Sequence, residues 1–262
     1  MTHGSFVAVG DSFTEGLDDP YPDGAAFRGW ADLLADRLAV RESGFRYANL
    51  AVRGKLLGEI VAEQVPLAEE LRPGLVSIAG GGNDVLRRRY DPELLAAQLD
   101  GALRRLAATG ARVVVFTGAD VTTRMPGTAW IRPRILALNE TIRAAAARHG
   151  AVLVDPSFDR VFDDPRIWSE DRLHLNAAGH RRIASYVLDA LELPPEEAWR
   201  PTPPVSPPAP WSSARRDDLR WIRVHVAPWM RRRLARKSSG DTALPKRPVL
   251  EPLVPADGTR RG

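Results

Sequence analysis

Short apolar runs alternate with longer amphipathic stretches along the first 192 residues. The short runs predict strands at Phe6–Val9, Tyr47–Ala51, Leu75–Ala79, Arg112–Thr117 and Ala151–Asp155. The longer stretches have helical spacing and predict helices at Gly29–Leu38, Lys55–Leu71, Pro92–Thr109, Ile131–His149 and Asn176–Leu191. Continuous apolar strands separated by amphipathic helices are typical of an α/β protein whose parallel sheet is covered on both faces.

Three residues that are candidates for catalytic roles each follow one of the first three predicted strands. Ser12 comes after the first strand, Gly54 after the second and Asn83 after the third. In parallel α/β sheets the working residues lie at the carboxyl ends of the strands. We therefore expect Ser12, Gly54 and Asn83 to meet at one edge of the sheet.

A different pattern begins at residue 193. Leu193–Pro210 contains eight Pro residues, which predicts an extended segment without regular helix. Ser213–Lys237 is basic and aromatic, with apolar residues at near-helical spacing, and Pro228 is expected to end one helix and start the next. Ser238–Gly262 is Pro-rich and polar, so we expect order there only where it docks. The chain thus divides into a domain, 1–192, and an extension, 193–262.

Charge divides the chain at the same place. Residues 193–262 carry 14 Lys and Arg against 7 Asp and Glu, whereas residues 1–192 carry 23 against 26.

Cys is absent, which excludes disulfides and thiolate catalysis. The sequence shows neither a secretory signal nor an apolar run long enough to span a bilayer, and we therefore expect a cytoplasmic protein.

Two short motifs contain the residue types of nucleophilic catalysis. Ser12 lies in Gly10-Asp11-Ser12, and an alcohol needs a base to become nucleophilic. Asp171-x-x-His174 supplies one, because His exchanges protons near neutral pH and an Asp can orient its ring. Taken alone, the Ser motif is explained equally well as a helix cap. The Asp-x-x-His motif taken alone is explained better by an Asp that caps the next helix, beside a surface His. Among the other His residues, His180 is the rival base.

Gly54 and Asn83 are candidate oxyanion donors, together with the backbone N–H of Ser12. A Gly N–H approaches a substrate without obstruction, and an Asn amide is a neutral donor that fits beside a developing alkoxide. For each residue taken singly, a place in a turn is at least as good an explanation.

The order of the motifs is more specific than any one of them. The chain resembles the SGNH (GDSL-type) hydrolase family over residues 5–191, through Gly10-Asp11-Ser12, Asn49-x-Ala51-x-x-Gly54, Gly81-x-Asn83-Asp84 and Asp171-x-x-His174. The resemblance implies a flavodoxin-like three-layer α/β/α sandwich for the catalytic domain, 1–192. It also implies that Ser12 is the nucleophile, His174 the general base and Asp171 its orienting acid. Ser12, Gly54 and Asn83 would form the oxyanion hole.

The function implied by this resemblance is serine-dependent hydrolysis of carboxylic esters through an acyl-enzyme, without a metal or cofactor. The alternative is an acyltransferase that uses the same triad to pass the acyl group to a sugar or another alcohol. A non-catalytic binding module is disfavoured, because such a module does not need these residues together. The candidate pocket rim comprises Asp18–Arg28, Arg87–Arg89 and Thr122–Trp130; the Arg run is more often a solvated surface, but in the cleft it would favour an anionic substrate.

The extension, 193–262, allows three hypotheses. We favour a strap that docks on the catalytic domain, since the charges of the two parts are opposite. Peripheral membrane contact through the basic aromatic helix comes second, and disorder or another partner comes third. Nucleic acid is not expected, because the cluster Arg231–Arg233 is short and no recognition motif accompanies it. The expected partner is a small-molecule acyl ester, and no oligomeric state is assigned.

Overall fold

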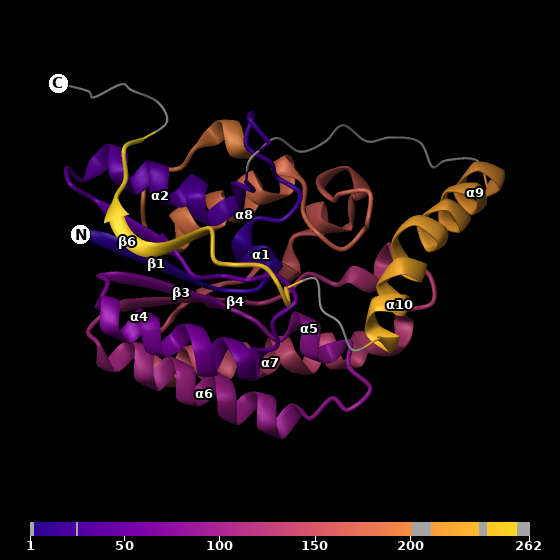
Figure 1. Ribbon diagram of the computed structural model, residues 1–262, viewed down its shortest axis with the longest axis horizontal. Coiled ribbons are helices and arrows are strands. Elements are labelled where there is room, and N and C mark those ends of the chain that lie inside the picture. Colours follow the sequence, from indigo (N-terminus) through magenta and orange to yellow (C-terminus); the bar gives the residue numbers. More distant parts are fainter. Residues whose placement is uncertain (1–2, 25, 201–210, 236–239, 256–262) are drawn as a thin grey trace.

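The computed structural model describes residues 3–24, 26–200, 211–235 and 240–255. It contains a six-stranded sheet in the order β5-β4-β3-β1-β2-β6 (Figure 1). The strands are β1 (Ser5–Gly10), β2 (Arg46–Asn49), β3 (Leu75–Ala79), β4 (Arg112–Phe116), β5 (Val152–Val154) and β6 (Arg247–Pro252). The first five are parallel, whereas β6 runs antiparallel to β2. The predicted parallel α/β sheet is confirmed, and the order of β1–β5 is that of flavodoxin-like folds.

Helices cover both faces of the sheet and give three layers (Figure 1). One face carries α2 (Gly29–Arg41) and α8 (Ala177–Ala190), which contact each other. The other face carries α4 (Val65–Leu71), α6 (Pro92–Ala108) and α7 (Arg132–His149). The predicted three-layer sandwich is therefore confirmed.

Short helices connect the main elements. α1 (Ser12–Glu15) follows β1, and α5 (Gly82–Val85) follows β3. The helix predicted at Lys55–Leu71 consists of α3 (Leu57–Glu59), the π-helical η1 (Ile60–Gln64) and α4. Single 3₁₀ turns are η2 (Val121–Thr123), η3 (Ala129–Ile131), η4 (Pro156–Phe158), η5 (Arg160–Asp163), η6 (Pro165–Ile167) and η7 (Glu197–Trp199).

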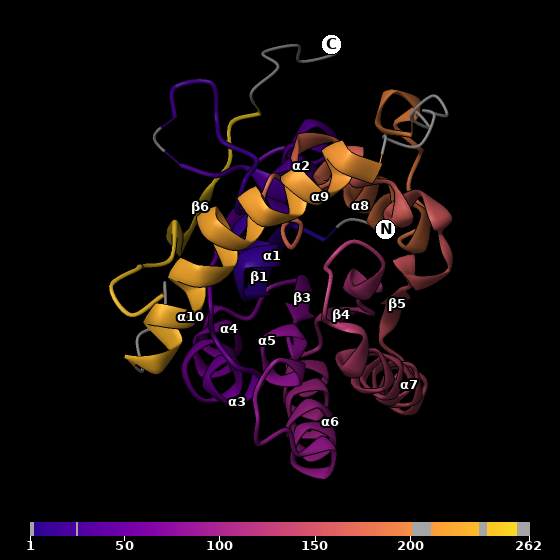
Figure 2. The ribbon, with the colours of Figure 1, turned by 90° about the vertical axis from the view of Figure 1, so that its right-hand side faces the viewer.

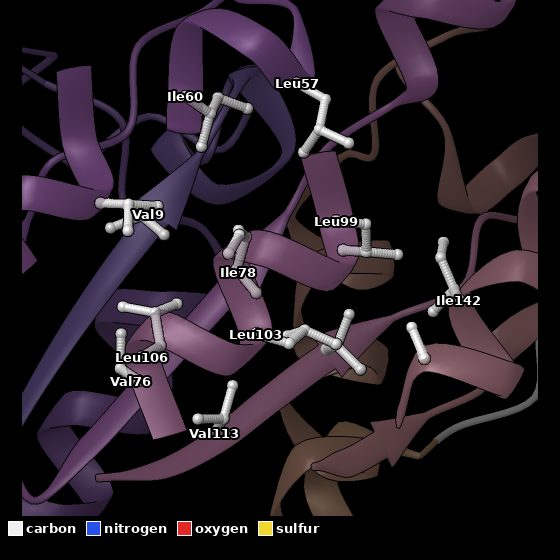
Figure 3. Close-up of a cluster of buried hydrophobic side chains, with 14 of the residues drawn as sticks. Val9, Leu57, Ile60, Val76, Ile78, Leu99, Leu103, Leu106, Val113 and Ile142 are labelled. Atoms are coloured by element: carbon white, nitrogen blue, oxygen red, sulfur yellow. The ribbon is translucent and has the colours of Figure 1, made fainter. Parts of the chain in front are cut away.

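Two apolar clusters hold the layers together, one on each face of the sheet. Figure 3 shows part of the first, in which Ile78 of β3 lies near Leu103 of α6. The second places Phe6 of β1 together with Leu34 of α2. Every residue of β3 is buried, which fits its mainly apolar sequence, Leu-Val-Ser-Ile-Ala. Full burial of such side chains stabilises the fold by about 1.5–3 kcal/mol each.

A long helical segment of the extension crosses the edge formed by the carboxyl ends of the strands (Figure 2). It comprises α9 (Trp211–Trp221), the π-helical η8 (Ile222–Val226) and α10 (Ala227–Leu234). The expected break at Pro228 is absent, because the helical backbone continues and Pro228 lies in the first turn of α10. Residues 201–210 of the predicted Pro-rich segment lie outside the described residues.

The extension also supplies β6, which the sequence pattern did not predict. Lys246, directly before β6, places Nζ 2.9 Å from Asp32 Oδ1 of α2. Asp32 also accepts hydrogen bonds from the hydroxyls of Tyr21 and Tyr47, at 2.7 and 2.6 Å. This buried group fixes the start of β6 to residues 1–192. Over the described ranges, no helix has the length and apolar character needed to cross a membrane.

Candidate active site

Ser12 is the first residue of α1, just beyond the carboxyl end of β1. Gly10 ends β1 at a point where no side chain fits: a Cβ there would lie 2.6 Å from Thr14 Oγ1 and 2.7 Å from the Ala79 carbonyl oxygen. Asp11 then caps α1, because its Oδ1 accepts a hydrogen bond from the Phe13 N–H at 3.1 Å. The close strand exit and the cap together fix the position of Ser12 at this edge of the sheet.

His174 lies between η6 and α8 and reaches Ser12 across this edge. Its Nε2 is 3.0 Å from Ser12 Oγ, and its Nδ1 is 2.5 Å from Asp171 Oδ2. The other oxygen of Asp171 accepts the backbone N–H groups of Leu173 and His174, both at 2.9 Å. Ser12, His174 and Asp171 therefore form a continuous chain of hydrogen bonds, with Asp171 held by the backbone of its own loop.

The electrostatics of this chain favour a charged Asp171 beside His174. Burial raises the pKa of Asp171, but hydrogen bonds from His174 and Ser169 outweigh it and hold that pKa well below its ordinary range. Burial lowers the pKa of His174, but the hydrogen bond and charge of Asp171 outweigh it, so that pKa lies above its ordinary value. Asp11 differs, because burial raises its pKa to about 6. The imidazole is thus placed to accept a proton from Ser12.

Asn83 lies beside the nucleophile turn, at the start of α5. Its Nδ2 donates to the Lys55 carbonyl at 3.0 Å and to Asp11 Oδ2 at 3.2 Å. Asn83 lines the same pocket as Ser12, whereas Gly54 is not among the described residues that line it. Gly54 has a left-handed backbone, with φ of 76°, in the turn directly before Lys55. The structure brings Asn83 to Ser12 and places Gly54 in the adjacent turn.

A mostly apolar pocket of about 200 Å³ opens beside Ser12. Its walls come from the residues after β1, β3 and β4, and from α7. Apolar side chains in these walls include Phe13, Leu86, Phe116, Ile135 and Leu138. Of the three segments expected at the rim, Asp18–Arg28, Arg87–Arg89 and Thr122–Trp130, no described residue lines this pocket. The site therefore combines a polar catalytic chain with an apolar cavity, as small-molecule sites commonly do.

His180, the rival base, is buried in α8 and bonded to backbone on both sides. Its Nδ1 accepts the Trp30 N–H at 3.3 Å, and its Nε2 donates to the Leu17 carbonyl at 3.2 Å. Burial lowers the pKa of His180 to about 4. A neutral ring with both nitrogens engaged joins α2 to the loop after α1, so His180 has a structural role.

Two buried polar residues that support the nucleophile turn were not identified from the sequence. Gln64 of η1 accepts the Gly10 N–H at 2.7 Å and donates to the Gly10 carbonyl at 2.9 Å. Glu15 of α1 accepts the Arg53 N–H at 2.8 Å and pairs with the Arg53 guanidinium. The available signal for Gln64 was its position, since it lies four residues from both Ile60 and Ala68 on the apolar face of its helix.

Asp18, Asp171 and His174 bring three ligand atoms within 4.8 Å of one another, which is the kind of group that can hold a metal ion. Asp18 Oδ2 lies 3.9 Å from His174 Nδ1. That nitrogen is much closer to Asp171, and the opposite nitrogen contacts Ser12. The hydrogen bonds of the group therefore fit proton transfer.

The residues of this site lie in a part of the chain that matches a known protein family. The model of the GDSL-like lipase/acylhydrolase family matches residues 8–182, which include Ser12, Asn83, Asp171 and His174. The match spans more than half of the chain.

Individual relatives agree with this assignment. A GDSL lipase, Rv0518, of Mycobacterium tuberculosis is 29% identical over 71% of this chain and 81% of its own length. The esterase TesA of Pseudomonas aeruginosa is 28% identical over 72% of this chain and 88% of its own. The crystal structure of LAE5, an alpha/beta hydrolase enzyme from the metagenome of Lake Arreo, superposes with a TM-score of 0.59 at 27% identity, covering 72% of this chain and 94% of that one.

Proposed function

Because the chain belongs to the GDSL-like lipase/acylhydrolase family and is an ester-bond hydrolase of that type, we propose that Ser12, His174 and Asp171 hydrolyse a carboxylic ester through an acyl-enzyme. The observation that carries this proposal is the hydrogen-bonded chain from Ser12 Oγ through His174 to Asp171 Oδ2. This is the arrangement by which an adjacent base activates an alcohol.

The reaction proceeds in two halves. His174 accepts the Ser12 proton at Nε2 while Oγ attacks the acyl carbon, and Asp171 stabilises the resulting imidazolium at Nδ1. The tetrahedral intermediate breaks its bond to the alcohol, which leaves with the proton from Nε2. Water then attacks the acyl-enzyme with His174 again as base, which releases the carboxylic acid and restores Ser12.

We assign the oxyanion of each intermediate to the Asn83 amide and the backbone N–H groups of Ser12 and Gly54. Support comes from Asn83, which shares the pocket with Ser12 and is oriented by the Lys55 carbonyl. Its bond to Asp11, at 3.2 Å, is the longer of the two and is the one that an oxyanion would replace. Neutral donors fixed in advance stabilise developing charge without reorganisation.

The acyl group of the ester binds in the apolar pocket. Ser12 lines this pocket together with apolar residues that include Leu138 and Ile142 of α7. Transfer of an alkyl chain from water into such a cavity is favourable by about 0.8 kcal/mol per buried methylene. An ester with an apolar acyl chain therefore fits the site better than one with a charged acyl group.

Hydrolysis of p-nitrophenyl acetate, butyrate, octanoate and laurate by the wild type and by Ser12→Ala tests the proposal. We expect turnover by the wild type and loss of turnover in Ser12→Ala, with the folded state of both checked by circular dichroism. Equal turnover by the two proteins would remove Ser12 from the mechanism. Absence of turnover in a folded wild type would contradict the assigned reaction on these esters.

A further inference from the structure

The catalytic loop contacts a helix that lies beyond residue 182, where the family match ends. Trp221, the last residue of α9, donates its indole N–H to the backbone carbonyl of Asp171 at 2.8 Å. Asp218, one turn earlier, pairs with Arg172 Nη1 at 2.6 Å. Figure 2 shows the helix crossing this edge of the sheet. Two side chains of the extension therefore bind Asp171 and Arg172, at the start of the loop that leads from the proposed catalytic Asp to His174.

The backbone at this point of the loop is one that needs external support. Arg172 has φ of 62°, a left-handed conformation that is sterically unfavourable for a residue with a Cβ. Such a conformation persists where the surroundings fix it. Arg124 Nε donates to the Arg172 carbonyl at 2.9 Å from one side, and the Arg172 guanidinium lies 5.0 Å from the centre of the Trp221 ring on the other. Arg172 is thus held between the domain and the helix.

Trp221 differs from its neighbours on the helix. Its side chain is 5% exposed, whereas Leu219 is 67% and Ile222 44% exposed. A buried indole usually finds a partner for its N–H, and here that partner is the carbonyl of Asp171. The helix directs this aromatic side chain at the catalytic loop and its neighbours at solvent.

We propose that α9 is a positioning element of the active site and that Trp221 is a positioning residue, which holds Asp171 and His174 in line with Ser12 through the Asp171 carbonyl. The inference rests on the proposed function of the triad. The hydrogen bond fixes the peptide between Asp171 and Arg172, and this peptide sets the direction of the Asp171 side chain. A small misplacement of a catalytic group lowers the rate without a new contact to substrate.

Trp221→Phe in the full chain tests this role, because Phe keeps an aromatic ring and removes the N–H donor. We expect kcat to fall by about 3- to 10-fold, the value of one hydrogen bond, with little change in KM. We also expect the acidic limb of the kcat/KM profile to move to lower pH, because a looser Asp171 raises the pKa of His174 less. Leu219→Ala, on the exposed side of the same helix, is the matched control and should leave both readouts unchanged.

Asp218→Asn is a second variant, since it weakens the pairing with Arg172 and leaves Trp221 in place. Asp218→Asn should move the acidic limb of the kcat/KM profile to lower pH, by a smaller amount than Trp221→Phe does. A merely structural role would lower the amount of folded enzyme but would leave the pH limb where it is. Wild-type values of kcat and of the pH limb in folded Trp221→Phe would overturn the inference.

A measurement without turnover separates this inference from the proposed function. The pKa of His174 is followed by NMR in the wild type and in Trp221→Phe. A lower pKa in the variant supports the positioning role even if no ester is hydrolysed, and an unchanged pKa contradicts it. Loss of Ser12-dependent hydrolysis in the wild type would instead contradict the function and leave the NMR comparison to decide the inference.

Discussion

His174 obtains both its orientation and its basicity from one neighbouring carboxylate. Asp171 holds Nδ1 at 2.5 Å, which leaves Nε2 to face Ser12 Oγ. The same contact raises the pKa of His174 above its ordinary value, despite the opposite effect of burial. A stronger base accepts the Ser12 proton more readily, but it is also protonated over a wider range of pH.

The pH dependence of the rate follows from this residue. In the proposed mechanism His174 must be neutral to act as base, so kcat/KM should fall as the pH drops through its pKa, which Asp171 raises above the ordinary value for His. Asp171→Asn removes the charge that raises this pKa, so the acidic limb moves to lower pH, while kcat falls by up to about 10⁴ through loss of the correct tautomer. Steady-state kinetics across the acid and neutral range measure both effects. A limb that does not move would show that Asp171 does not act on His174.

Asn83 is the residue on which the oxyanion assignment depends most. Asn83→Ala should lower kcat by about 10²–10³ with little effect on KM, because the lost bond forms only as charge develops. Lys55→Ala is the control, since it keeps the carbonyl that orients Asn83. If kcat of Asn83→Ala stayed within a few-fold of the Lys55→Ala value, the oxyanion would have other donors.

Single residues of the site were predictable to different degrees. Ser12 and His174 were predicted because four short motifs stand in the order found in the SGNH family, so their roles rest on that resemblance. Gln64 was not, because a polar residue on an apolar helix face does not reveal what it will bind. Its partner, Gly10, is 54 residues away, and their contact depends on the packing of η1 against β1.

Among the elements, α7 supplies part of the pocket wall and can be tested on both of its faces. Leu138 is buried and lines the pocket, whereas Leu136 is 49% exposed. Leu138→Phe fills part of the cavity, so the long octanoyl chain loses space that the acetyl group does not need. The ratio of kcat/KM for the octanoate ester to that for the acetate ester should therefore fall by about 10-fold or more. Leu136→Phe adds the same bulk on the solvent side and should leave the ratio unchanged. Equal ratios in the two variants would place the acyl chain elsewhere.

The five parallel strands and the main helices of the first 192 residues followed from local pattern, whereas β6 did not. The predicted parallel strands are mainly apolar, and helices cover the sheet on both faces (Figure 1). β6 has the sequence Arg-Pro-Val-Leu-Glu-Pro, and four of its six side chains are exposed. Its pairing with β2 comes from contacts about 200 residues apart in the chain, which no local pattern encodes.

The anchor of β6 can be measured as stability. Lys246→Ala leaves Asp32 buried with only its two tyrosine partners, and removal of one member of a buried ion pair costs about 3–5 kcal/mol. Lys55→Ala breaks an exposed pair with Glu63 and should cost no more than about 1 kcal/mol. Urea unfolding of the two variants gives the comparison. Equal losses of unfolding free energy would show that the buried pair does not anchor the extension.

At the scale of the whole molecule, the described residues of the extension contact residues 1–192 at several places, one of which is the pairing of Glu196 with Arg37 of α2. The strand β6 joins the outer edge of β2, and α9 lies against the catalytic loop (Figures 1 and 2). The opposite charges of residues 1–192 and 193–262 favour such contacts. Docking was expected from the opposite net charges, yet the pair at the catalytic loop has the reverse sign, because the extension supplies Asp218 and residues 1–192 supply Arg172.

The most direct test of the account is covalent trapping of the nucleophile. A p-nitrophenyl alkylphosphonate reacts with an activated serine to form a stable adduct in place of the acyl-enzyme, and mass spectrometry of the digested protein locates it. The account predicts one phosphonyl group on Ser12 and markedly slower labelling in His174→Ala. An adduct on another residue, or equal labelling of the wild type and Ser12→Ala, would contradict the assignment of Ser12 as the nucleophile.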